Sequence, residues 1–165
     1  MSLEEGNVLI FHPIAVHFAI ALVLFGFVTD LVGSLREHGH ARRIGRSCFL
    51  SGVGALGLAV LSGWIEQELP RPPSAFDVQM QGVLFRHEYL GYGLFALFLV
   101  LGIIRMRIHR RLPFLFVLLA ALGSVGIIFQ GYLGGELVYR YGAGVRAVQV
   151  LSARVGESEQ KKTPE

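Results

Sequence analysis

The sequence is poor in cysteine and in charged residues. Only one of its 165 residues is a cysteine, Cys48, so an intramolecular disulfide and a cysteine-based metal site are both excluded. Charged residues make up 16% of the chain, whereas 53% of it is hydrophobic and the mean hydropathy is +0.55. A soluble domain of this size would carry more charge. The scarcity of charge therefore indicates a chain that lies within a membrane.

Four apolar stretches account for nearly all of the length. Each has about 20 residues, which is what a helix needs to cross the hydrocarbon core of a bilayer. Backbone N–H and C=O groups in hydrocarbon must be paired within their own segment, so each stretch is predicted to be a helix. We expect Pro13 and Pro113 to open the first and fourth helices, because proline suits the first helical turn. The predicted spans are residues 13–33, 48–65, 85–104 and 113–137.

These spans predict an all-α protein, an integral membrane four-helix bundle with an additional C-terminal interfacial helix or extension. The single transmembrane domain is expected over residues 1–155. Apolar residues between Val145 and Val155 alternate with Arg146 and Arg154, a pattern that suits a helix lying at the membrane surface. The polar segment 156–165 is expected to be disordered.

Arginines are concentrated in two of the three connections between spans. Because positive residues stay on the cytoplasmic side, both connections are predicted to be cytoplasmic and both termini periplasmic, in a bacterial inner membrane. This topology also explains the pI of about 9.4 without a nucleic-acid partner; the expected partner is the lipid bilayer. The eight arginines are Arg36, Arg42, Arg43 and Arg46 in the first connection and Arg105, Arg107, Arg110 and Arg111 in the last.

Glycines recur inside the predicted spans. Gly52, Gly54 and Gly57 form a GxGxxG string, but it lies in the middle of a membrane helix and follows no strand, which excludes a dinucleotide site. Small residues at such spacing allow helices to approach closely.

Polar residues gather at the periplasmic ends of all four spans. His17 lies a full turn into an apolar helix, and an ionisable residue there is expected to face the bundle interior. His87 lies at a similar depth in the third span. Asp30, near the cytoplasmic end, is expected to pair with a loop arginine. The remaining polar residues at the periplasmic end are His12, Glu66, Glu88, Gln130, Glu136 and Tyr139.

Two histidines that face each other across a bundle suit a six-coordinate haem. His17 and His87 would each supply one axial nitrogen. Gly91, one turn from His87, would leave room for the porphyrin, and Arg86 and Arg140 would pair with its propionates. In the fourth span, Gly134 or Gly135 is expected to lie against the first span or a bound ring, while Glu136 and Tyr139 line the polar cluster with His12.

A metal ion is the alternative for the same residues. His17 and His87, with His12 as a possible third ligand and a carboxylate from Glu88 or Glu136, would suit zinc or copper. The spacing argues against it, since five helical residues turn through about 140° and one regular helix face cannot present both His12 and His17.

The two ends of the chain carry motifs of a known kind. HPIAVHFAIAL, from His12, resembles the opening HPxxVHFPxAL of a family of small bacterial membrane proteins of unknown function. GYLGGELVYRYGAGV, from Gly131, resembles the family's close, GxLGGxLVYxHGxGV, and His87 falls where the family often has a third histidine. The resemblance implies four spans and a redox or haem-related role. Ala19 replaces the usual proline, which should matter little. Tyr141 replaces the usual histidine, which argues against a four-histidine or two-haem site.

The resulting hypothesis is a haem b-binding electron-transfer subunit with its site near the periplasmic face, exchanging electrons with a quinone or a larger membrane redox complex. A non-enzymatic accessory subunit of a membrane complex is the alternative. No serine or cysteine has a plausible base beside it in the sequence, so an enzyme with its own substrate is not predicted.

Overall fold

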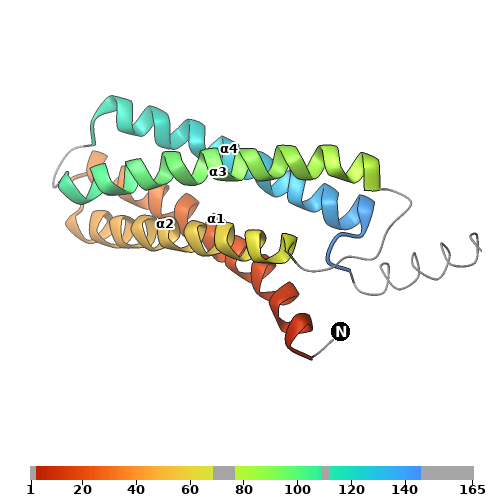
Figure 1. The fold of residues 1–165 in the computed structure, drawn as a ribbon. Helices are drawn as coiled ribbons and strands as arrows, with labels where there is room; N and C mark the ends of the chain where they lie inside the picture. Colours follow the sequence, from red (N-terminus) through yellow and green to blue (C-terminus); the bar gives the residue numbers. More distant parts are fainter. Residues whose placement is uncertain (1–2, 69–76, 109–111, 146–165) are drawn as a thin grey trace, which may run out of the picture.

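The protein consists of long helices. The computed structural model describes residues 3–68, 77–108 and 112–145, and these ranges contain no strand (Figure 1). The prediction of an all-α protein is confirmed, whereas most of the predicted C-terminal extension and the whole polar tail lie outside the described residues. The helices are α1 (Leu3–Leu35), α2 (Gly39–Gln67), α3 (Asp77–Arg107) and α4 (Phe114–Tyr141).

All four helices are long and apolar enough to cross a membrane. They contain 28 to 33 residues, and their lengths of about 42 to 50 Å exceed the roughly 30 Å of hydrocarbon in a bilayer. Three of them begin at least two turns before the predicted spans. Large apolar side chains that point away from the bundle, such as Phe18, Phe25 and Leu122, are more than half exposed and would face lipid.

Only one of the two prolines that were predicted to open a helix does so. Pro113 is the N-cap of α4, as the sequence suggested. Pro13 lies well inside α1 and does not open it, because the helix already begins at Leu3. Gly142 ends α4 with a left-handed φ of 67°, which glycine adopts without strain, and its N–H bonds to the carbonyl of Val138. The closing motif therefore ends the helix, four residues beyond the predicted end of the span at residue 137.

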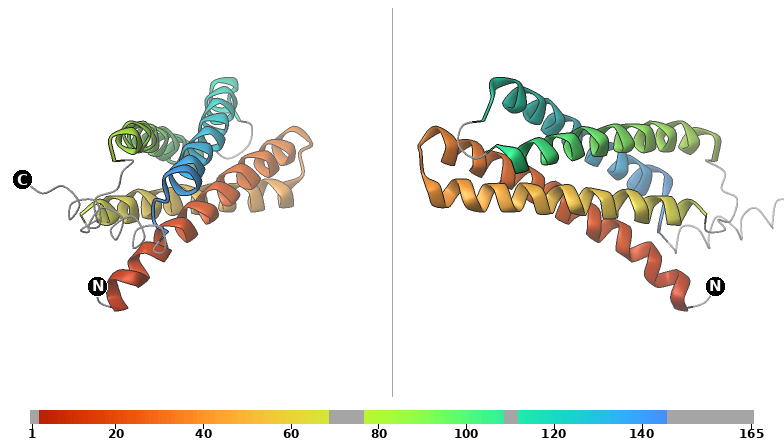
Figure 2. Two further views of the ribbon diagram at one scale, coloured as in Figure 1. Left: turned by 90° about the vertical axis from the view of Figure 1, so that its right-hand side faces the viewer. Right: turned by 60° about the vertical axis from the view of Figure 1, so that its left-hand side comes forward.

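The helices form a ring in which each contacts two neighbours. α1 lies beside α2 and α4, and α3 lies beside the same two, so α1 and α3 are diagonally opposite. Figure 2 shows α1 and α2 running alongside each other, with the N-terminal turns of α1 diverging from the other helices. A contact between α1 and α3 must therefore be made by side chains that reach across the centre of the bundle.

A seam of glycines joins α1 to α2. Gly26 and Gly33 of α1 alternate with Gly45 and Gly52 of α2, each pair at a seven-residue spacing, which is the repeat of supercoiled helices. A Cβ atom on any of the four would overlap the main chain of the facing helix. Close approach was predicted for Gly52 and is present, whereas a Cβ on Gly54 would meet nothing within 4 Å.

A buried ion pair crosses the bundle at the end away from the N-terminus. Arg105 donates to both carboxylate oxygens of Asp30, from Nε over 2.5 Å and from Nη2 over 2.8 Å, and the two side chains are 1% and 2% exposed. Arg105 also donates to the carbonyl of Ile108. The sequence placed Arg105 in a loop, and this is wrong: it lies in the last turn of α3 and turns inward to reach Asp30.

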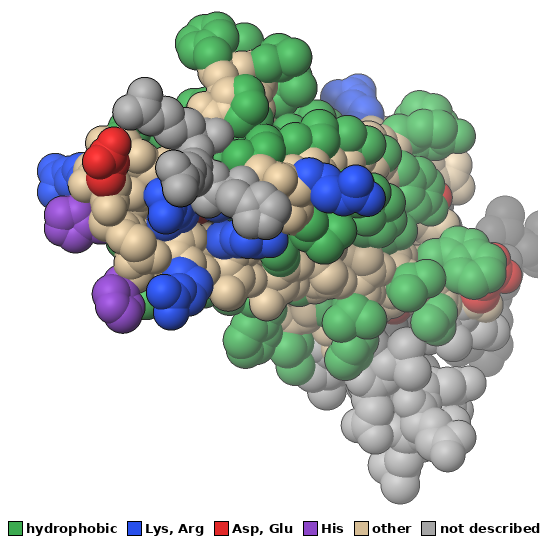
Figure 3. Space-filling model, turned by 90° about the vertical axis from the view of Figure 1, so that its left-hand side faces the viewer, with side chains coloured by type: hydrophobic (Ala, Val, Ile, Leu, Met, Phe, Trp, Pro, Cys, Tyr) green, Lys and Arg blue, Asp and Glu red, His purple; other side chains and the backbone are tan. Residues whose placement is uncertain are grey.

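Arginines and histidines cover the surface around that end. Figure 3 views it directly and shows basic and histidine side chains around the α1–α2 connection. Arg36, His38, His40 and Arg43 are all exposed there. Between this end and the opposite one lies an apolar core in which the Phe49 ring is tilted against Phe98 at 5.9 Å.

Candidate functional site

His12 reaches from α1 onto α2, near the end of the bundle that carries the N-terminus. Its Nδ1 lies 3.0 Å from the carbonyl oxygen of Ala59 and 2.9 Å from the hydroxyl oxygen of Ser62. The Ser62 hydroxyl already donates its only hydrogen to the Ala59 carbonyl. Both oxygens can therefore only accept from His12, so Nδ1 carries the hydrogen and Nε2 keeps a lone pair. Gly63 makes room for the ring, because a Cβ there would lie 3.1 Å from Cε1 of His12.

His87 of α3 packs against α4 beside Gln130. Nε2 of Gln130 donates to the carbonyl oxygen of His87 over 2.8 Å. Two buried side-chain atoms here have no hydrogen-bond partner among the described residues, Nδ1 of His87 and Oε1 of Gln130. A buried polar atom without a partner costs roughly 1–3 kcal/mol. The site is therefore suited to a ligand or an ordered water that pairs with these atoms.

His12 and His87 are close enough to interact electrostatically. Because α1 and α3 are diagonally opposite, the two imidazoles approach each other from opposite sides of the bundle. All four helices contribute to this site, which we call the imidazole site and define by His12, Ser62, His87 and Gln130. The lone pair on Nε2 of His12 can bind a metal centre or accept a hydrogen bond from a hydroxyl group.

His17 does not belong to the imidazole site. The side chain is exposed, and its Nδ1 lies 2.6 Å from the carbonyl oxygen of Pro13, one turn back in the same helix. The expectation that it faces the interior is therefore wrong. Residues 12 and 17 differ by about 140° around a regular helix, and α1 is already helical at residue 12. With His12 turned toward α2, His17 has to point outward.

The glycines predicted to surround a haem have different neighbours. Gly134 lies against His87 of the third span rather than against the first span, since a Cβ there would be 3.2 Å from Cε1 of the imidazole. The space beside Gly91 is filled by the amide of Gln130, whose Nε2 would lie 3.0 Å from an added Cβ. Gly135 faces the ring of Tyr139 in its own helix. Of the three, only Gly134 makes room for an imidazole.

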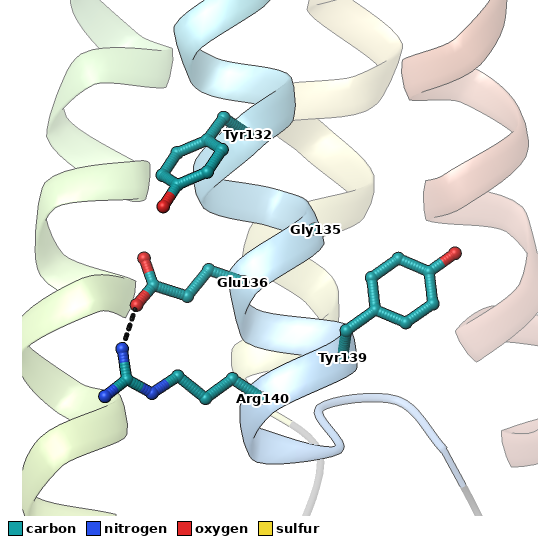
Figure 4. A pocket seen from close by; sticks show the side chains of 5 residues that line it. All are labelled: Tyr132, Gly135, Glu136, Tyr139 and Arg140. Atoms are coloured by element: carbon teal, nitrogen blue, oxygen red, sulfur yellow. Dashed lines mark hydrogen bonds and ion pairs between the residues drawn. The ribbon is translucent and has the colours of Figure 1, made fainter.

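The arginines and acids of the predicted cluster also lie elsewhere. Nη1 of Arg140 donates to Oε1 of Glu136 over 2.9 Å within α4. Figure 4 shows Tyr139 turned to the other side of the same helix, where its side chain is 92% exposed. The expectation that Glu136 and Tyr139 line a cluster with His12 is therefore wrong. Arg86 is exposed on α3, and no described contact brings it to the imidazoles.

The remaining carboxylates do not complete a metal site. Glu88 accepts a hydrogen bond of 2.8 Å from the hydroxyl of Tyr92, one turn along α3. Glu66 is half-buried near the end of α2. Within the three described ranges, no group of three or more histidine, cysteine or acidic side chains is arranged to hold a metal ion. The predicted zinc or copper set is therefore not assembled.

The comparison with known families agrees with the fold. A family model matches residues 9–147, a range that includes both terminal motifs, and its description reads "Predicted membrane protein (DUF2231)". The chain belongs to the DUF2231 family. The resemblance to a family of membrane proteins of unknown function is thereby confirmed. No curated protein and no solved structure matches the chain. Because the DUF2231 description names no activity, the function has to be inferred from the imidazole site.

Proposed function

We propose that this chain is an electron-transfer subunit that binds one haem b between His12 and His87. The main support is that two half-buried imidazoles from diagonally opposite helices lie near each other at one end of a membrane bundle. Haem iron with two histidine ligands takes one nitrogen from each side of the porphyrin. Helix bundles bind such groups between facing helices. His12 replaces His17 in the hypothesis because His17 points away.

The hydrogen bonds of His12 suit it to act as a ligand of haem iron. Ala59 and Ser62 fix the hydrogen of His12 on Nδ1 and so leave Nε2 for a ligand, which is how neighbouring groups orient ligating imidazoles in metal sites. Beyond His87, Val83 packs with Leu133 and Leu137 of α4 and excludes water on that side. A bound haem would supply one-electron chemistry. The part of the protein is to hold the iron, fix the orientation of the imidazoles and keep the surroundings apolar.

Visible spectroscopy tests the proposal. The full chain, purified in mild detergent from cells grown with ample haem, is expected to show a Soret band and a reducible α-band. His12→Ala and His87→Ala should abolish both bands. His17→Ala is the matched control, because it removes an exposed histidine of the same helix and should leave the spectrum unchanged. A colourless chain, or a spectrum lost only in His17→Ala, would contradict the proposal.

A quinol is the second candidate ligand, and Oε1 of Gln130 favours it. Among the residues that the structure describes, this buried acceptor has no partner, and iron does not pair with it. A quinol hydroxyl could donate to it, or to Nε2 of His12. Extraction of the same preparation with organic solvent should then release a quinone that is absent from a Gln130→Leu preparation. If neither haem nor quinone is found and the chain purifies with other membrane proteins, the accessory-subunit alternative is favoured.

The proposal places the imidazole site near the periplasmic face of a bacterial inner membrane, in reach of membrane quinones or a redox complex. It is supported by the basic residues around the opposite end of the bundle, since positive residues stay in the cytoplasm. Reporter fusions after Leu35 and after Leu112 should both give cytoplasmic signals. A periplasmic signal at either position would reverse the orientation.

A further inference from the structure

The last turns of α4 carry a hollow that the imidazole site does not use. It has a volume of about 360 Å³ and is lined by Tyr132, Gly135, Glu136, Tyr139 and Arg140. In Figure 4, Tyr139 lies on one side of α4 and the other three side chains lie on the opposite side. We call it the α4 hollow. Counted from Phe114, the first residue of α4, about 20 residues of helix cross the hydrocarbon, so we expect these residues near the level of the lipid headgroups. Tyrosine is the residue expected at that level.

The α4 hollow contains a positive side chain, Arg140, and a negative one, Glu136, and both can form further hydrogen bonds. In the part of the chain that the structure describes, Glu136 and Arg140 are joined by one hydrogen bond of 2.9 Å. A guanidinium has five N–H donors and a carboxylate has two acceptor oxygens. Arg140 is 69% exposed, and its guanidinium lies 5.6 Å from the ring centre of Tyr141. A ligand with an anion beside a cationic donor can therefore add bonds to both residues.

We propose that the α4 hollow binds the headgroup of phosphatidylethanolamine, with the phosphate on Arg140 and the ammonium on Glu136. The two residues are one helical turn apart, and a two-carbon bridge keeps the two lipid charges close enough to reach both. The ammonium has three N–H donors for the carboxylate. Phosphatidylcholine has the same charges but no N–H donor, and phosphatidylglycerol has no cation. This site is independent of any ligand between His12 and His87.

Native mass spectrometry of the full chain tests the proposal. The protein is stripped of lipid in mild detergent and then incubated with equal amounts of the three phospholipids. Phosphatidylethanolamine should be retained about fivefold better than either competitor, a modest ratio because the ion pair is partly exposed. Glu136→Gln should remove the preference over phosphatidylcholine. Arg140→Gln should weaken the retention of all three lipids.

A substitution that fills the hollow separates shape from charge. A Cβ on Gly135 would touch only the Tyr139 ring, at 3.9 Å, so Gly135→Leu should fold and abolish the preference while both charges remain. Gly93→Leu on α3 is the matched control, since a Cβ there would meet nothing within 4 Å. Equal retention of the three lipids by the natural chain, or an undiminished preference in Gly135→Leu, would overturn the proposal.

Discussion

The pair α1–α2 and the pair α3–α4 use glycine in different ways. In the first pair, glycines lie against the main chain of the facing helix, as Gly45 does against Asp30. In the second pair, glycines of α4 lie against the ends of side chains, as Gly126 does against Leu94. A main chain cannot move aside without shifting its helix, whereas the end of a leucine can rotate. The first pair is therefore a rigid frame, and the second can adjust around it.

The largest loss of stability is expected from breaking the Asp30–Arg105 ion pair, which joins α1 of the first pair to α3 of the second. Arg105→Leu would leave the Asp30 carboxylate buried without its partner, which costs roughly 3–5 kcal/mol in proteins. We expect a large drop in the midpoint of thermal unfolding in detergent. The double variant Asp30→Leu with Arg105→Leu should recover much of the loss, because no buried charge is left. A single variant as stable as the natural chain would show that the ion pair does not join the two pairs.

A smaller loss of stability is expected from substituting a glycine between α1 and α2, the rigid frame. Gly45→Ala places a methyl group against the main chain at Asp30, and overpacking of this kind costs typically 1–3 kcal/mol, more than the roughly 1 kcal/mol by which alanine favours a helix. The yield of folded protein and its unfolding midpoint should both fall. Gly54→Ala, in the same helix but facing open space, is the control and should be neutral or slightly stabilising.

The smallest loss of stability is expected from substituting a glycine between α3 and α4. A Cβ on Gly126 would lie 2.7 Å from Cδ2 of Leu94, the far end of a side chain that can change rotamer. Gly126→Ala should therefore change the free energy of unfolding by less than about 1 kcal/mol. If unfolding measurements give the same loss for Gly126→Ala as for Gly45→Ala, the contrast between the two pairs is wrong.

The fold could be predicted because hydrocarbon leaves the backbone few choices. Four apolar runs had to be four helices, and Pro113 marked the start of the last one. The start of α1 was missed because the turns before Pro13 are less apolar than the span that follows. Arg105 was missed for a related reason: an arginine at a span end is usually solvated, and only the packed bundle shows that it reaches Asp30.

The candidate site could be predicted only in part. The sequence identified His87 and the end of the bundle, but it chose His17 over His12 because Pro13 seemed to start the helix. The seven-residue spacing of the seam glycines was the signal that could have corrected this choice, since it sets the register of the α1–α2 pair and places His12 opposite Gly63. Ser62, the partner of His12, would have followed from the same register.

The central claim is that His12, not His17, meets His87 across the bundle, and thiol crosslinking tests it without any cofactor. In a Cys48→Ala background, His12→Cys is combined with His87→Cys, and His17→Cys with His87→Cys as the matched pair. A short bis-maleimide should join the first pair within one chain, detected as a single added crosslinker mass with no free thiol, and should leave the second pair unjoined. Crosslinking of the second pair alone would place His17 inside and contradict the account.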